Sequence, residues 1–215
     1  MMAALRGSAR SSAGAHAVVR TLPCGLLDNG PDLAAELAAS THVEPAIEAA
    51  RIAAAMIGGG LLQASGPAQR GLDTARAFPR DPAVLRSLTP DASAVSALAG
   101  GVYAAASFPD DVRQAVIFAA ENAGSARSGK GAEGVEGAEG ADGAESADGV
   151  EGNAATVAGA LLGAINGPEA LPTDLVARLE LAWPGEVLAR DLVQELSGRL
   201  DRADEERWWA RYPGA

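Results

Sequence analysis

The stretch PAIEAARIAAAMIGGGL, Pro45–Leu61, decides the fold class that we expect for this chain. Its apolar residues recur every three or four positions, which is the period of one face of an α-helix; they are Ile47, Ala50, Ala54, Ile57 and Leu61. Three consecutive glycines, Gly58–Gly60, weaken the last turn because glycine loses the most backbone freedom in a helix. We therefore predict a helix after Pro45 whose end either frays or makes a close contact.

Similar helix signals lie on both sides of this stretch. Before it, Pro31 suits a first helical position and Asp32 suits a first turn, which predicts a helix over Asp32–Ala39. After it, residues 64–90 contain four prolines and are expected to form a connector with one short helix around Leu72 and Ala75. The next two helices are predicted to start at Thr89-Pro90-Asp91 and at Pro109-Asp110-Asp111.

The last part of the chain predicts three more helices. Asn153 is expected to cap the first helix, which ends at Asn166-Gly167-Pro168. Thr173 is expected to cap a second, short helix that runs through Leu181. After a break at Trp183-Pro184-Gly185, one face of the last long helix is apolar; it carries Leu188, Leu192, Leu196 and Leu200.

The composition agrees with an all-α fold. Hydrophobic residues make up 48% of the chain but aromatic residues only 4%, and alanine supplies much of the difference, which favours closely packed helices. An alternating, strand-like pattern occurs only over the short stretch Val18–Leu22. We predict one helical domain formed by residues 14–124 and 153–215, with a ragged N-terminus at residues 1–13.

An acidic low-complexity tract interrupts this predicted domain. From Gly131 to Gly152 the chain repeats triplets such as Gly-Ala-Glu, and seven acidic residues here contribute seven of the eleven net negative charges. Glycine-rich sequence with charge of one sign cannot offset the entropy cost of ordering, so residues 125–152 are expected to form a disordered insert. The rest of the chain carries a net charge of only −4.

Several functional classes are disfavoured by the sequence. The acidic balance and the few aromatic residues argue against nucleic-acid binding. No apolar run is long enough to span a membrane, and the single cysteine, Cys24, fits a reducing compartment, so we expect a cytoplasmic protein. His16 and His42 are expected to cap or pack, and the spacing of residues identifies no catalytic residue.

Several segments resemble the ADP-ribosylglycohydrolase family, and they follow the family's order along the chain. Residues 14–27 resemble its Gly-Asn-Gly-Ala-x-Met-Arg-Val-x-Pro-x-Gly segment, in which Arg20, Pro23 and Gly25 match while Ala15 and His16 replace the Asn-Gly pair. Residues 40–55 resemble the Leu-Thr-His turn and the helix after it. Further similar segments are Ala97–Gly124, Ala158–Pro172 and Trp208–Gly214. The resemblance implies an all-helical hydrolase that removes ADP-ribose from modified proteins with the help of Mg²⁺.

The metal motifs of the family are not found in this sequence. The Gly-Asp-Ala and Thr/Ser-Asp-Asp-Thr motifs are missing, and the two aspartates of a C-terminal Asp-x-Asp motif align with Val150 and Gly152. Mg²⁺ requires oxygen ligands, so the carboxylates that remain as candidate ligands are Asp148 and Glu151. We therefore expect an N-terminally truncated member with weak or no activity.

Two further expectations follow from this resemblance. Helices without their usual neighbours would expose apolar faces, which predicts an oligomer or a partner that supplies the N-terminal part. An alternative function is a non-catalytic helical module that binds ADP-ribose or a protein. For such a binding module, Arg20 is the residue best suited to bind an anionic phosphate.

Overall fold

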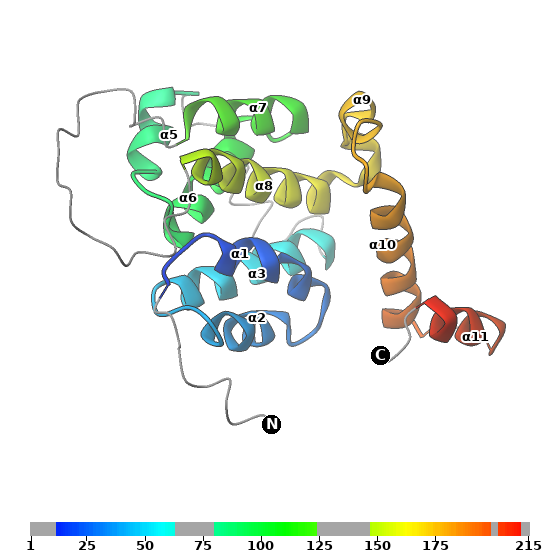
Figure 1. The fold of residues 1–215 in the computed structure, drawn as a ribbon. Helices are drawn as coiled ribbons and strands as arrows, with labels where there is room; N and C mark the ends of the chain where they lie inside the picture. The colour runs from blue at the N-terminus through cyan, green and yellow to red at the C-terminus, as the bar shows by residue number, and fades with distance from the viewer. Residues whose placement is uncertain (1–11, 63–79, 124–146, 199–201, 212–215) are drawn as a thin grey trace, which may run out of the picture. The chain divides into compact units, whose positions relative to one another are not determined.

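The computed structural model describes residues 12–62, 80–123, 147–198 and 202–211 (Figure 1). Every regular element in these ranges is a helix, and the pairing of extended segments there amounts to two isolated bridges, Ser12 with His42 and Gly14 with Ser93. The predicted all-α class is therefore confirmed. The chain divides into two compact units, Met1–Leu171 and Pro172–Ala215. No helix in the described ranges is long and apolar enough to cross a membrane.

The first unit opens with four helical segments. They are α1 (His16–Thr21), the 3₁₀ helix η2 (Leu22–Leu26), α2 (Gly30–Ala39) and α3 (Ala46–Leu62). The helices predicted around Asp32–Ala39 and after Pro45 are confirmed. The strand-like stretch Val18–Leu22 is instead helical, because Val18 and Thr21 are both buried on one side of α1. An alternating pattern over only five residues is a weak strand signal, and burial of these side chains against other helices favours the helix.

Three capped helices follow in the first unit. They are α5 (Pro82–Leu88), α6 (Ala94–Ser107) and α7 (Val112–Asn122). In each case an Asp or Ser oxygen accepts a hydrogen bond from a first-turn N–H: Asp81 from Ala83 at 2.7 Å, Ser93 from Ser96 at 3.2 Å and Asp111 from Gln114 at 3.0 Å. The residues of α5 were expected to form part of a connector because of their prolines. Pro82 instead occupies the first turn of the helix, where proline is tolerated. The helix predicted around Leu72 and Ala75 lies outside the described residues.

Helix α8 (Ala147–Asn166) is followed by the 3₁₀ helix η3 (Pro168–Ala170). Its end matches the prediction, since Gly167 adopts a φ of 80°, which suits glycine just after a helix. Its start does not: Asn153 lies inside the helix, so the predicted cap at this residue is wrong. Residues 147–152, which were predicted to belong to the disordered insert, form the first turns of α8 instead. Residues 124–146 lie outside the described residues.

Helix α8 is the central element of the first unit, where it contacts α1, α3, α6 and α7. Figure 1 shows it (yellow-green) running beside α6 and α7. The crossing with α6 is close because Gly100 and Gly101 face Ala154 and Val157. A Cβ atom added to Gly101 would lie only 2.5 Å from Cβ of Val157. Around this crossing the core is built largely of alanine, with Leu85, Leu161 and Leu162 as its largest fully buried side chains.

The second unit contains α9 (Thr173–Val176), α10 (Ala182–Leu196) and α11 (Arg202–Arg211). The short helix at Thr173 ends at Val176, before the predicted Leu181. Trp183-Pro184-Gly185 does not break the chain but forms the first turn of α10, where proline is tolerated because the first N–H groups have no helical acceptor. The predicted segment 153–215 is thus divided between the two units at Leu171 and Pro172.

The close crossing of α6 and α8 predicts that Gly101→Val destabilises the protein. The added methyl groups would collide with Val157 and the Ala154 carbonyl, and overpacking of this kind costs about 1–3 kcal/mol. Gly152→Ala is the control, because no atom lies within 4 Å of a Cβ at that site on α8. Urea denaturation measures both variants. Equal stability of G101V and the wild type would contradict the crossing.

The start of α6 predicts a loss of stability in acid. Hydrogen bonds from Ser93 and Ser96 hold the pKa of Asp91 below its ordinary value. A carboxylate with a lowered pKa stabilises the fold above its ordinary pKa, and this contribution is lost as the pH falls through the folded-state value. We expect Asp91→Asn to be less stable than the wild type at pH 6. The difference in urea midpoint should shrink toward pH 3, and a constant difference would contradict this prediction.

Candidate functional site

The segment with the most specific resemblance, residues 14–27, folds as α1 and η2. Arg20 lies in the last turn of α1, and its Nη2 donates to the carbonyl oxygen of Leu37 at 2.7 Å and to Oγ1 of Thr41 at 2.5 Å. Leu37 is in the last turn of α2, where the carbonyl groups have no partner within the helix and carry partial negative charge. The Arg20 guanidinium therefore ties the end of α2 to α1.

The same arginine joins the two segments with the clearest resemblance. Thr41 Oγ1 lies 2.8 Å from Nδ1 of His42, so Arg20, Thr41 and His42 form one hydrogen-bonded cluster. Backbone pairing adds to it, since the N–H of Val43 donates to the carbonyl of Ser12 at 3.0 Å. Sequence reasoning identified Arg20 but not its partners, because a contact between residues 21 positions apart has no local signal. The role of Arg20 in anion binding stays a prediction.

Gly25, one of the positions that match the family segment, lies at a close packing contact. A Cβ atom there would lie 2.5 Å from the Ala54 carbonyl and 2.7 Å from Cβ of Ile57, both on α3. Across the same contact, a Cβ on Gly58 would approach the Gly25 carbonyl to 2.9 Å. Of the two outcomes expected for the glycines that end α3, Gly58 therefore shows the close contact. Nearby Cys24 is buried, and desolvation raises the pKa of its thiol.

The predicted metal position lies in the first turns of α8. Val150 and Gly152, the positions to which the resemblance assigns the family's two aspartates, are both within this helix. Asp148 and Glu151 also lie in this helix, but the structure does not describe their side chains. In the described part of the chain, no group of three or more His, Cys, Asp and Glu residues is arranged to hold a metal ion.

A pocket of about 260 Å³ lies where α6 passes into α7. Arg80 covers the ring of Phe108, with Cζ 4.5 Å from the ring centroid, and its Nε donates to the Ser107 carbonyl at 3.0 Å. Asp111 serves as the N-cap of α7. The Pro-Asp-Asp segment noted in the sequence thus lines a real concavity, and Arg80 is the residue that sequence reasoning missed. Its lining residues are Arg80, Phe108, Pro109, Asp110, Asp111 and Gln114.

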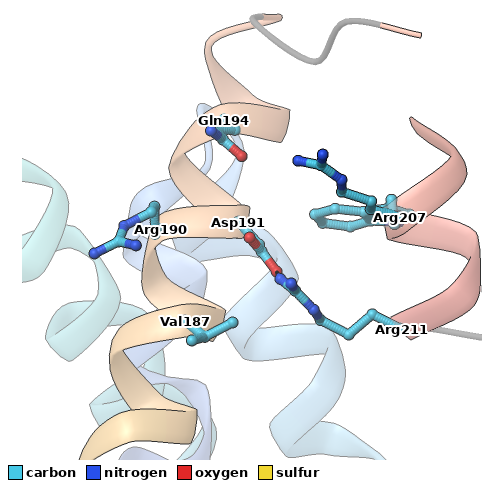
Figure 2. A pocket seen from close by; sticks show the side chains of 7 residues that line it. Val187, Arg190, Asp191, Gln194, Arg207 and Arg211 are labelled. Atoms are coloured by element: carbon cyan, nitrogen blue, oxygen red, sulfur yellow. Dashed lines mark hydrogen bonds and ion pairs between the residues drawn. The ribbon is translucent and has the colours of Figure 1, made fainter. Parts of the chain in front are cut away.

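The second unit contains its own pocket of about 190 Å³, between α10 and α11. Figure 2 shows Arg211 extending from α11 to Asp191 on α10, with which it forms an ion pair. Arg190 is bonded instead to Glu186 one turn earlier, at 2.7 Å. The ion pair of Arg211 with Asp191 joins the two helices, whereas that of Arg190 with Glu186 lies within α10. Its lining residues are Val187, Arg190, Asp191, Gln194, Arg207, Trp208 and Arg211.

Comparison with protein families shows where this helical framework belongs. The family model described as ADP-ribosylglycohydrolase matches residues 1–208, which is nearly the whole chain. This chain belongs to the ADP-ribosylglycohydrolase family. No curated protein and no solved structure gives a match to it. Members of the family act on ADP-ribosylated substrates and generally depend on Mg²⁺, and membership indicates an ADP-ribosylglycohydrolase-like function.

The cluster around Arg20 predicts a structural effect of substitution. Arg20→Ala removes both hydrogen bonds and leaves the end of α2 without its cation, and we expect a loss of about 1 kcal/mol because the site is exposed. Thr41→Val removes the bond to Arg20 and the contact with His42 Nδ1 but leaves the bond from Arg20 to the Leu37 carbonyl, so α2 keeps its cation. Thermal unfolding of both variants measures the effect. If R20A is as stable as the wild type, Arg20 does not join α1 to α2.

Proposed function

We propose that this member of the family keeps its helical framework and hydrolyses ADP-ribose linkages weakly or not at all. What supports the proposal is the resemblance at two positions on α8, which assigns the two aspartates of the family's Asp-x-Asp motif to Val150 and Gly152. Neither residue has a side-chain oxygen, so neither can bind Mg²⁺ through its side chain.

The neighbouring acids do not restore the motif. Asp148 and Glu151 are three residues apart, whereas the aspartates of Asp-x-Asp are two apart, so these acids cannot occupy both positions of the motif. Metal sites depend on ligands held in a fixed geometry, and catalysis in addition requires the reacting groups to be positioned closely. Asp148 and Glu151 remain the candidate metal ligands of this chain, for a site that would differ from the motif.

Substrate recognition is the part of the family's function that the described residues support better. Arg20 has five N–H donors, and Nη2 alone accounts for the bonds to Leu37 and Thr41. A guanidinium held in this way is already oriented, which lowers the entropy cost of binding an anion. We propose that Arg20 contacts a phosphate of ADP-ribose. This binding would not require turnover.

The proposal predicts the result of two measurements on the full chain. Release of ADP-ribose from an ADP-ribosylated protein should show little or no increase on addition of Mg²⁺. Calorimetry should show at most weak Mg²⁺ binding, and Asp148→Asn with Glu151→Gln should abolish whatever binding is seen. The double variant Val150→Asp, Gly152→Asp provides the matched gain-of-ligand control. Hydrolysis by the unmodified chain that depends on Mg²⁺ would overturn the proposal.

Binding of ADP-ribose distinguishes the remaining alternatives. Calorimetric binding without Mg²⁺ that is weakened by Arg20→Lys, with the thermal stability unchanged, would support a binding module. Lysine keeps the charge but cannot reproduce the fork of the guanidinium, so it separates geometry from charge. The absence of any binding would refute the role proposed for Arg20.

A further inference from the structure

The pocket of about 260 Å³ where α6 passes into α7 is separate from the candidate metal position. Asn166, the last residue of α8, donates through Nδ2 to the carbonyl of Pro109, which lines this pocket, at 2.7 Å. Asp148 and Glu151 lie in the first turns of the same helix, roughly 20 Å away along an axis that rises 1.5 Å per residue. The pocket is therefore a site of its own within the first unit.

Arg80 is fixed at the wall of this pocket by two contacts. Its guanidinium lies over the ring of Phe108, with Cζ 4.5 Å from the ring centroid, and its Nε donates to the Ser107 carbonyl at 3.0 Å. The backbone beside it is held as well, because the N–H of Asp81 donates to the Tyr103 hydroxyl at 3.2 Å. Among the described residues, Nη1 and Nη2 of Arg80 have no hydrogen-bond or ion-pair partner. Arg80 thus has two oriented donor nitrogens that the described protein does not use.

Acidic side chains line the same pocket. Asp110 and Asp111 are both exposed, and neither forms an ion pair with Arg80. Oδ1 of Asp111 accepts from the N–H of Gln114 at 3.0 Å as the cap of α7, whereas its Oδ2 has no partner among the described residues. Arg80 and Asp111 therefore line one pocket without neutralising each other.

These charges decide which class of ligand the pocket suits. A guanidinium with two available nitrogens suits a carboxylate or a phosphate, but Asp110 and Asp111 would repel a phosphate with two negative charges. A small molecule with one carboxylate and one ammonium group satisfies both sides. We propose that the pocket binds the zwitterionic head of a free α-amino acid, with its carboxylate on Nη1 and Nη2 of Arg80 and its ammonium on the Asp111 carboxylate. This site is independent of the function proposed above.

Nuclear magnetic resonance titration of the full chain tests the ligand class with four probes. L-alanine carries both charged groups, whereas N-acetyl-L-alanine lacks the ammonium and L-alanine amide lacks the carboxylate. We expect saturable binding of L-alanine with a dissociation constant on the order of millimolar, because exposed ion pairs are screened by water. Binding of the two blocked probes should be about tenfold weaker or more, and inorganic phosphate should bind more weakly than L-alanine.

Two substitutions test the two contacts one at a time. Arg80→Gln removes the guanidinium, and Asp111→Asn removes the negative charge but keeps an oxygen that caps α7, because asparagine is as good an N-cap as aspartate. Each should weaken L-alanine binding about tenfold or more, since each removes a hydrogen bond between charged groups. Arg86→Gln is the matched control: Arg86 is exposed on α5 and does not line the pocket, so this variant should bind as the wild type does.

Several results would overturn the proposal. One is the lack of saturable L-alanine binding. Equal binding of L-alanine and N-acetyl-L-alanine would show a site for simple carboxylates, and stronger binding of phosphate would show a general anion site; both exclude a zwitterion site. Equal effects of R80Q and R86Q would place the ligand elsewhere. If R80Q lowers the unfolding temperature, D111N decides alone, and wild-type affinity in a stable D111N would refute the ammonium contact.

Discussion

The close approach of α6 and α8 at Gly100 and Gly101 is the contact around which the first unit is organised. Side chains of any size at these positions would meet Ala154, Val157 or Thr89 at less than van der Waals distance. With glycine there, α8 comes near enough to α6 for Val157, Leu161 and Leu162 to be fully buried. In a core made mostly of alanine, dispersion contacts accumulate only when helix backbones lie close together. The positions of α3 and α7 around α8 follow from this crossing.

The same packing logic explains which parts of the family pattern this chain retains. Gly25 is held by its contact with α3, and Arg20 by its bonds to the end of α2 and to Thr41. Both residues stabilise the helical framework whether or not a reaction takes place. These packing contacts involve neither Val150 nor Gly152, the positions that the resemblance assigns to the family's carboxylates. The proposal of a member with little or no hydrolysis therefore leaves the helical framework intact.

The two units differ in how they are stabilised. The first contains a continuous buried cluster from Ala17 to Leu162, and its buried polar groups, among them Thr21 and Thr89, bond to backbone carbonyls. In the second, the ion pair of Arg211 with Asp191 joins α11 to α10, and Asp191 is the buried residue of α10. Ion pairs that are partly exposed contribute little to stability. Large apolar side chains of this unit, such as Leu181 and Leu188, are exposed and do not form a core of its own.

The sequence by itself determined the all-α class and many of the helix boundaries. Pro31, Pro45 and Asp111 act within a single turn, and Gly167 ends α8 through its own backbone conformation, so their effect can be read locally. Tertiary structure decided what depends on distant residues. The helical state of Val18–Leu22 depends on burial against other helices, α8 extends beyond the expected cap at Asn153, and the pairing of Arg20 with Thr41 spans 21 residues. Caps and turns are local interactions, whereas burial and side-chain pairing depend on which surfaces meet after folding.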